Sequence, residues 1–291
     1  MSDNYIEMLK VDILKRALND GGFASIPKGY YRPDETAWAV IALKAMGCHF
    51  NFVKKSQSML ESSQLNDGRI ILSKGCEEAF WPTALAVMAW ENSQDYLEAK
   101  SQGIDFLLKN SGMHWIKKKN SFTGHDSSIR GWPWIENTHS WVEPTSLVLL
   151  ALEANGVRDN DRAREARRML LDRQLRDGGW NYGNTTVFGR QLRAMPESTG
   201  LALNALAGKT PLKNVKKSIE YLKSEIDRLK TPLSYSWAFL GLSAWGEMPK
   251  INRRSLIENY KRRETYGTHR TEEICLIIFS MLSKNGFLGI L

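Results

Sequence analysis

The apolar residues of this chain gather in six runs, separated by polar segments that keep a helical pattern. Each run opens on a hydroxyl-bearing residue, and successive runs start between 36 and 62 residues apart. The first residues of the runs are Thr36, Thr83, Thr145, Thr199, Tyr235 and Thr271. Spacing of this size is typical of a repeated helix hairpin. It predicts that the apolar runs are inner helices and that the amphipathic segments between them are outer helices.

Glycine-rich turns follow several of the outer segments. Examples are residues 19–23 (NDGGF), 66–68 (NDG) and 177–180 (DGGW). Glycine readily adopts the positive φ that ends a helix, so we expect these turns to lead from an outer helix to the next inner one. Six such hairpins predict an all-α fold, an (α/α)6 toroid, with residues 1–291 forming a single domain.

The segment around the last of these turns, RQLRDGGWNYG, resembles a repeat found in known enzymes. It is similar to the glutamine-tryptophan repeat of squalene/hopene cyclases, oxidosqualene cyclases and the β-subunits of protein prenyltransferases. The matching residues are Gln174, Asp177, Gly178, Gly179 and Trp180. Degenerate copies extend the resemblance over nearly the whole chain. It implies a toroid of six inner and six outer helices around an apolar cavity.

The starts of the inner helices are where we expect the chemistry. If consecutive hairpins are equivalent, the inner helices run parallel and their N-termini gather at one mouth of the ring. Glu143 in WVEPTS and Glu197 in MPESTG stand at two of these starts and are candidate catalytic acids. Both also fit ordinary helix-start chemistry, in which Pro144 is preset for a first helical turn.

A third helix start carries a resemblance of its own. The segment RPDETAWAVIAL is similar to the acid motif of class II terpenoid cyclases, an Asp-any-Asp-Asp-Thr-Ala string whose central aspartic acid protonates an alkene or epoxide. Asp34 takes the central place and Glu35 the last, which implies that Asp34 is the catalytic acid. Arg32 replaces the first aspartate, and a cation beside Asp34 favours its ionised form. The structural alternative is a first-turn carboxylate that balances the helix dipole.

The candidate substrate-binding residues lie on or beside the same helix starts. The chain has ten tryptophans, and a cavity lined with π faces stabilises a carbocation while withholding nucleophiles. The substrate-binding candidates are Arg32, Glu35, Trp38, Trp81, Trp134, His139, Trp141, Tyr235, Trp237 and His269.

The longest step between two runs contains an insertion, residues 112–140, that mixes basic and aromatic residues. Its length exceeds what a tight connection between helices needs, so it is either a packed lid over the mouth or a surface loop. The residues in it that could meet a diphosphate are Lys117, Lys118, Lys119 and Arg130. The alternative for them is a solvated run of charge.

Composition narrows the class of protein. The net charge of +8 is spread over the presumed outer helices and no nucleic-acid-binding motif occurs, so we expect no nucleic-acid partner. Cys48, Cys76 and Cys275 fall in no paired spacing, which is typical of a reducing compartment. Neither a signal-peptide pattern nor an apolar run long enough for a membrane span is present. We expect a cytoplasmic protein, with peripheral membrane contact and a partner subunit left open.

Three functions remain in competition. The first is an enzyme that folds an apolar substrate, an isoprenoid, in the cavity and cyclises it by acid, without a cofactor. The second is a non-catalytic or partner-dependent isoprenoid-binding subunit. The third is a zinc protein prenyltransferase, although no local Cys/His spacing indicates zinc. The residues that could meet at a zinc are His269, His139, Cys76 and Asp34. The sequence favours the first function, with no metal site.

Overall fold

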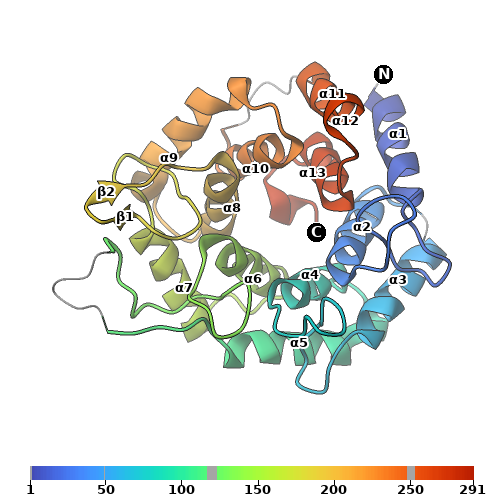
Figure 1. The fold of residues 1–291 in the computed structure, drawn as a ribbon, viewed down its shortest axis with the longest axis horizontal. Helices are drawn as coiled ribbons and strands as arrows, with labels where there is room; N and C mark the ends of the chain where they lie inside the picture. Colours follow the sequence, from blue (N-terminus) through green and yellow to red (C-terminus); the bar gives the residue numbers. More distant parts are fainter. Residues whose placement is uncertain (1, 49, 117–122, 248–252) are drawn as a thin grey trace.

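The computed structural model describes residues 2–48, 50–116, 123–247 and 253–291. Within these residues, six helices form an inner ring (Figure 1). They are α2 (Pro33–Ala45), α4 (Trp81–Ala89), α6 (Val142–Ala154), α8 (Pro196–Leu206), α10 (Pro232–Ser243) and α13 (Thr271–Leu282). Each inner helix contacts the next one around the ring, and α13 contacts α2, so the ring is closed.

An outer layer of helices surrounds the ring. It consists of α1 (Ser2–Leu14), α3 (Phe50–Ser62), α5 (Leu97–Lys109), α7 (Asp161–Asp172), α9 (Leu212–Glu225) and α11 (Arg253–Lys261). The shorter pieces are α12 (Arg263–Tyr266), η1 (Gln94–Tyr96), η2 (Ile226–Arg228), η3 (Phe287–Gly289), and the antiparallel pair β1 (Thr186–Val187) and β2 (Arg190–Gln191). Outer and inner helices alternate along the chain, which confirms the α/α toroid predicted from the repeats.

The two layers differ in burial as their sequences predict. Helix α2 buries every residue from Pro33 to Leu43, because it is covered by outer helices on one side and by inner neighbours on the others. Helix α7 is amphipathic and buries four residues along one face. These are Ala163, Ala166, Met169 and Leu170. Along the described helices, none is long and apolar enough to cross a membrane.

A recurrent hydrogen bond explains why a threonine opens four of the apolar runs. In each case its Oγ1 accepts from a backbone N–H in the loop before the helix, at 2.9 Å. The accepting threonines are Thr36, Thr83, Thr145 and Thr199. The donors are Phe23, Ile70, Trp132 and Trp180. A buried N–H without a partner is costly, so each threonine fixes the loop against its inner helix.

The last repeat has a different register from the one predicted. Thr36 is the fourth residue of α2, and Tyr235 is likewise the fourth residue of α10. Thr271, however, is the first residue of α13, so the position equivalent to Thr36 is Ile274. The predicted run TEEICLII therefore starts three residues too early along the chain, because Thr271 does not occupy the position of the other threonines.

Helices α8 and α10 approach each other more closely than side chains normally allow. A Cβ on Gly241 would lie 2.6 Å from the Cα of Gly200. Only glycine at both positions permits this backbone contact. The close packing brings the starts of the two helices together, where the Ser234 hydroxyl donates to Glu197 at 2.8 Å.

Candidate active site

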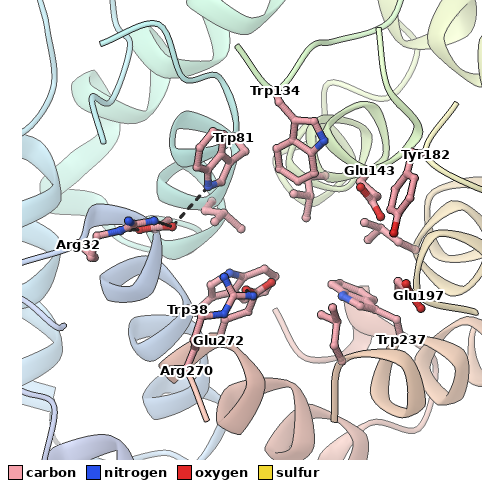
Figure 2. A pocket seen from close by; sticks show the side chains of 15 residues that line it. Arg32, Trp38, Trp81, Trp134, Glu143, Tyr182, Glu197, Trp237, Arg270 and Glu272 are labelled. Atoms are coloured by element: carbon pink, nitrogen blue, oxygen red, sulfur yellow. Dashed lines mark hydrogen bonds and ion pairs between the residues drawn. The ribbon is translucent and has the colours of Figure 1, made fainter. Parts of the chain in front are cut away.

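A cavity of about 340 Å³ opens where the six inner helices begin. Every inner helix contributes to its wall, and four further residues come from the loops before or between them (Figure 2). A volume of this size lies at the lower end of the range for small-molecule sites, which is roughly 300–1,000 Å³. The helix starts thus converge on one cavity, at the mouth of the ring.

Equivalent positions of the repeats form the upper level of the cavity, which we call the rim layer. Asp34 lies two residues before Thr36, and each of the other inner helices contributes the equivalent residue. The rim layer is Asp34, Trp81, Glu143, Glu197, Leu233 and Glu272. Four of these six are carboxylic acids, and one of them, Glu272, was missed because of the register of the last run.

One helical turn further on, a second level lies beneath the rim, which we call the deep layer. Residues four apart stand on the same face of a helix, so the deep layer follows from the same repeat. It consists of Trp38, Leu85, Leu147, Leu201 and Trp237. All five side chains are apolar, so the cavity is polar at its rim and apolar in its depth.

Four loop residues complete the wall. Trp134 comes from the insertion and Tyr182 from the loop after the turn at 177–180, while Arg32 and Arg270 directly precede α2 and α13. Trp134 packs edge-on against Trp81, with ring centroids 5.3 Å apart. The described part of the insertion therefore contributes one residue, Trp134, to the wall of the cavity. The remaining part, with Lys117, Lys118 and Lys119, lies outside the described residues, and Arg130 pairs with Glu165 of α7 instead.

The half of the rim formed by α2 and α13 is built from ion pairs. Arg32 donates to both oxygens of Asp34, from Nε at 2.9 Å and from Nη2 at 2.7 Å. This two-point geometry is that of an ionised carboxylate with a guanidinium group. The hydrogen bond to Asp34 raises the pKa of Arg32. The indole Nε1 of Trp81 approaches the same carboxylate at 3.5 Å.

Glu272 lies beside this pair and receives a hydrogen bond from Arg270 Nη2 at 2.7 Å. Its backbone N–H donates to Glu35 at 2.7 Å, and Glu35 also accepts from the Ser25 hydroxyl. Burial raises the pKa of Glu272 to about 7, against the opposing effect of Arg270. Burial and the nearby Asp34 also raise the pKa of Glu35. Glu35 therefore supports the helix start and does not line the cavity.

The half formed by α6 and α8 contains acids that are bound by hydroxyl groups. Ser198 donates to Glu143 at 2.8 Å, and Ser234 donates to Glu197 at 2.8 Å. Among the described residues, neither glutamate has an ion-pair partner. Burial raises the pKa of Glu143 to about 7, and the neighbouring Glu197 adds to this rise. Figure 2 shows both glutamates on the same side of the cavity, near Tyr182.

The predicted site residues divide into two groups. Those that line the cavity are Arg32, Asp34, Trp38, Trp81, Trp134, Glu143, Glu197 and Trp237. The structure does not bring Glu35, His139, Trp141, Tyr235 or His269 into the lining. Their placement has structural reasons. His139 stacks on Trp141, with ring centroids 4.2 Å apart, and Tyr235 is buried with only 4% of its surface exposed.

His269 is held behind the wall by several partners. Its Nε2 lies 3.0 Å from the carbonyl oxygen of Tyr260, and its Nδ1 lies 3.6 Å from Glu273. Burial lowers the pKa of His269, but the bonds to Glu273 and to the carbonyl groups raise it overall. Across the described residues, no group of three or more His, Cys, Asp or Glu side chains is placed to hold a metal ion.

Seven residues of the lining are not among the candidates that the sequence indicates. Three of them are polar, namely Glu272, Arg270 and Tyr182, and four are leucines, namely Leu85, Leu147, Leu201 and Leu233. Glu272 would have been found by aligning the acids of the helix starts instead of the threonines, because it follows the pattern of Asp34, Glu143 and Glu197. Tyr182 lies on a loop outside the repeat pattern, so no periodic signal indicates its position.

Comparisons with known proteins locate the fold. No protein-family model and no curated protein sequence matches the chain. Among solved structures, the chain is similar to an alpha-1,6-mannanase of Salegentibacter bound to alpha-1,6-mannotriose, at 12% identity and a TM-score of 0.65 over 98% of this chain and 99% of that chain.

Two other solved structures are similar over nearly their whole length. One is the type II terpene cyclase MstE of Scytonema bound to its substrate geranylgeranyl dihydroxybenzoate, at 12% identity and a TM-score of 0.61 over 100% of this chain and 98% of that chain. The other is an alpha-amylase of Clostridium perfringens, at 11% identity and a TM-score of 0.63 over 97% of both chains. At these identities the likenesses show the fold alone, so the chain is an α/α toroid of the architecture that these enzymes share.

Proposed function

We propose that the protein is an enzyme that cyclises an isoprenoid by acid in the toroid cavity. The observation that carries this proposal is a protonatable glutamate, Glu143, in the rim layer directly above an entirely apolar deep layer. Such a cavity suits a substrate whose reactive end lies at the rim and whose hydrocarbon chain fills the depth. The likeness to a type II terpene cyclase agrees with this proposal.

Glu143 is the proton donor in this proposal, in place of Asp34. A general acid has to carry a proton at the working pH, and a carboxyl with a pKa of about 7 does so in neutral solution. Asp34 instead has both oxygens occupied by Arg32, which binds the ionised form. The acid has thus moved from the α2 position of the repeat to the equivalent position of α6.

The proton balance of the reaction uses both halves of the rim. Glu143 donates a proton to a carbon of the terminal alkene, or to the oxygen of an epoxide, and a carbocation forms. The π electrons of the next double bond close a ring, and the tryptophan faces of the cavity stabilise the charge. The final cation loses a C–H proton to the Glu272 carboxylate, so an alkene substrate is isomerised without net gain or loss of atoms. Proton exchange with solvent then returns Glu143 to its acid form and Glu272 to its carboxylate form.

The apolar deep layer favours an isoprenoid over a sugar. A bound sugar would bury hydroxyl groups against Trp38, Leu85, Leu147, Leu201 and Trp237, whose side chains offer them no acceptor. Each buried hydroxyl without a partner costs about 1–3 kcal/mol. The similarity to a mannanase and an amylase is therefore limited to the toroid fold, and the lining of the cavity suits a hydrocarbon.

Turnover in D2O tests the proposed reaction. The purified protein is incubated with farnesol, geranylgeraniol and their terminal epoxides, and the products are analysed by mass spectrometry. From an alkene substrate we expect a cyclic product that carries one deuterium from the solvent on the carbon protonated first. From an epoxide the deuteron ends on an exchangeable hydroxyl group, so the expected result there is the cyclic product itself. Release of sugars from alpha-mannan or an alpha-glucan by the same protein, with no prenyl product, would contradict the proposal.

We also propose that the mouth of the ring rests on a lipid surface. Two of the most exposed large apolar side chains of the described residues are Tyr30, 92% exposed, in the loop before α2, and Tyr266, 77% exposed, at the end of α12, which precedes α13. Large exposed apolar side chains around a cavity mouth are typical of an interaction surface. The double variant Tyr30→Ser/Tyr266→Ser is expected to sediment less with anionic vesicles than the wild type, and equal sedimentation would contradict this contact.

A further inference from the structure

The chain returns to the middle of the ring after α13. Residues 283–291, which we call the floor segment, include η3, and Figure 1 shows them inside the ring of inner helices. Phe287 of this segment has no exposed surface. Nothing in the repeat pattern requires such a segment, because the six inner helices already close the ring.

Phe287 lies directly against the deep layer of the cavity. Its ring centroid is 5.7 Å from that of Trp38 and 5.6 Å from that of Trp237, in edge-on arrangements. Phe279 of α13 joins the same cluster, 5.4 Å from Phe287. Trp38 and Trp237 line the cavity and Phe287 does not, so Phe287 packs behind the lining against these two tryptophans.

Polar groups on the inner helices hold the floor segment in place. Asn204 of α8 is 2% exposed, and its Oδ1 accepts from the backbone N–H of Phe287 at 2.8 Å. Ser243 of α10 accepts from the N–H of Gly286 at 3.1 Å, and Ser283 donates to the Gly286 carbonyl at 2.7 Å. A buried asparagine in an apolar helix is costly unless its side chain makes hydrogen bonds. The acceptors Asn204 and Ser243 therefore hold the floor segment in one position.

The turn before Phe287 leaves no freedom for a different placement. Gly286 has a φ of 73°, which favours glycine, and a Cβ there would lie 2.5 Å from the Ala244 Cβ and 2.7 Å from the Asn204 Oδ1. The backbone therefore presses against α10 and α8 at this point. Phe287 is in consequence fixed beneath the two tryptophans.

We propose that the floor segment sets the depth of the cavity, and that Phe287 is the residue that limits the length of the hydrocarbon chain that fits. This inference rests on the proposed function for the identity of the chain as an isoprenoid, but the depth itself does not depend on it. A smaller residue at position 287 opens space below Trp38 and Trp237, since a fixed scaffold fills such a void only in part.

Ligand-length selectivity of Phe287→Ala tests the inference. Binding is measured by quenching of tryptophan fluorescence with two series of increasing length, prenyl alcohols from geraniol to geranylgeraniol and straight-chain alkanols. We expect the variant to bind the member one isoprene unit longer than the wild-type optimum about tenfold more tightly than the wild type does, because the added carbons become buried. The optimum of the alkanol series moves in the same direction.

Phe106→Ala is the matched control. Phe106 is also a buried phenylalanine, but it lies on the outer helix α5. Its ring packs against that of Phe80, with centroids 5.2 Å apart. The Phe106→Ala substitution removes the same number of buried side-chain atoms as Phe287→Ala. We expect it to lower stability without changing the ligand length that the protein prefers. The variant Asn204→Leu, which removes the acceptor for the Phe287 N–H, is expected to shift the preference in the same direction as Phe287→Ala.

The outcomes separate the two proposals. A shift in both series supports the floor inference, and an unchanged length optimum in a folded Phe287→Ala variant overturns it. If the alkanols show the shift while no prenyl alcohol binds, the floor inference stands and the proposed isoprenoid function fails. If neither series binds to the wild type, both are wrong.

Discussion

The two halves of the rim place acids at equivalent positions of the repeat, yet they give them different partners. On the α2/α13 half, Arg32 and Arg270 donate to Asp34 and Glu272. On the α6/α8 half, the hydroxyls of Ser198 and Ser234 take the place of the guanidinium groups. One position in the repeat therefore yields carboxyl groups paired with arginines in one half and carboxyl groups paired with serine hydroxyls in the other.

This difference shows that a motif position does not determine a chemical role. Asp34 has the helix start and the sequence neighbours of the acid motif, but the residue before its helix is an arginine. Glu143 lacks the motif, but burial and the nearby Glu197 raise its pKa to about 7. Burial is the largest cause of the raised pKa of both Glu143 and Glu272, and the hydrogen-bonding partner of each carboxyl group opposes that rise.

Glu143→Gln has the largest expected effect on this comparison. The amide cannot donate an acidic proton, and loss of a general acid lowers rates by about 100-fold to 10,000-fold. Turnover of the prenyl substrate should therefore fall by at least about 100-fold in a steady-state assay, whereas substrate binding measured by fluorescence stays near the wild-type value. Glu197→Gln is the matched control on the next helix, with a smaller loss. A larger loss of turnover in Asp34→Asn than in Glu143→Gln would place the proton donor on the α2/α13 half and contradict the role of Glu143.

The pH dependence of turnover is expected to be bell-shaped, with its maximum near pH 7. Glu143 acts as acid only when protonated, so turnover falls as the pH rises above about 7. Glu272 acts as base only when ionised, so turnover falls as the pH drops below about 7. Each limb approaches a tenfold loss per pH unit. Glu272→Gln should remove the acidic limb, and a profile with no basic limb would contradict the role of Glu143.

Arg32→Leu removes the main feature of the ion-paired half. Asp34 would keep its buried position without a guanidinium partner, and its side chain is only 11% exposed. Because Arg32 is itself 38% exposed, we expect a modest loss of roughly 1–2 kcal/mol in the free energy of unfolding at neutral pH. Chemical denaturation of the wild type and the variant at neutral pH measures this loss, and equal stability would show that the pair contributes nothing.

Ser198→Ala is expected to have the smallest effect. The Ser198 hydroxyl stabilises the ionised form of Glu143, which lowers its pKa, so removal of this donor should raise the pKa of Glu143. The basic limb of the pH profile then moves to higher pH by roughly a few tenths of a unit to one unit. A shift to lower pH would mean that the hydroxyl accepts a hydrogen bond from protonated Glu143 instead of donating one to its carboxylate.

Much of the fold followed from the sequence, because burial acts on every repeat in the same way. The threonines marked four helix starts correctly, since each accepts a hydrogen bond from the preceding loop. The same marker failed at Thr271, where the hydroxyl stands at the first position of α13, and so it hid Glu272. A pattern based on one residue type predicts the presence of a helix well. It predicts the register of that helix only where the residue makes the same contact in every repeat.

The site was predictable only in part, because its chemistry depends on contacts between repeats. The convergence of Asp34, Glu143 and Glu197 followed from parallel helix starts, and these three residues do line one cavity. The pairing of Ser198 with Glu143 joins two different helices, and no spacing within one helix indicates it. Phe287 gave no signal for the same reason, since its partners Trp38 and Trp237 lie far away in the sequence.

Titration of the glutamate carboxyl groups by carbon-13 NMR tests the central claim most directly. The protein is labelled at glutamate Cδ, and the resonance of Glu143 is assigned by its loss in Glu143→Gln. Glu272→Gln identifies Glu272, another glutamate with a raised pKa, in the same way. We expect Glu143 to titrate with a midpoint of about 7. A midpoint near the ordinary value of 4.5 would contradict the account, because Glu143 would then hold no proton to give at neutral pH.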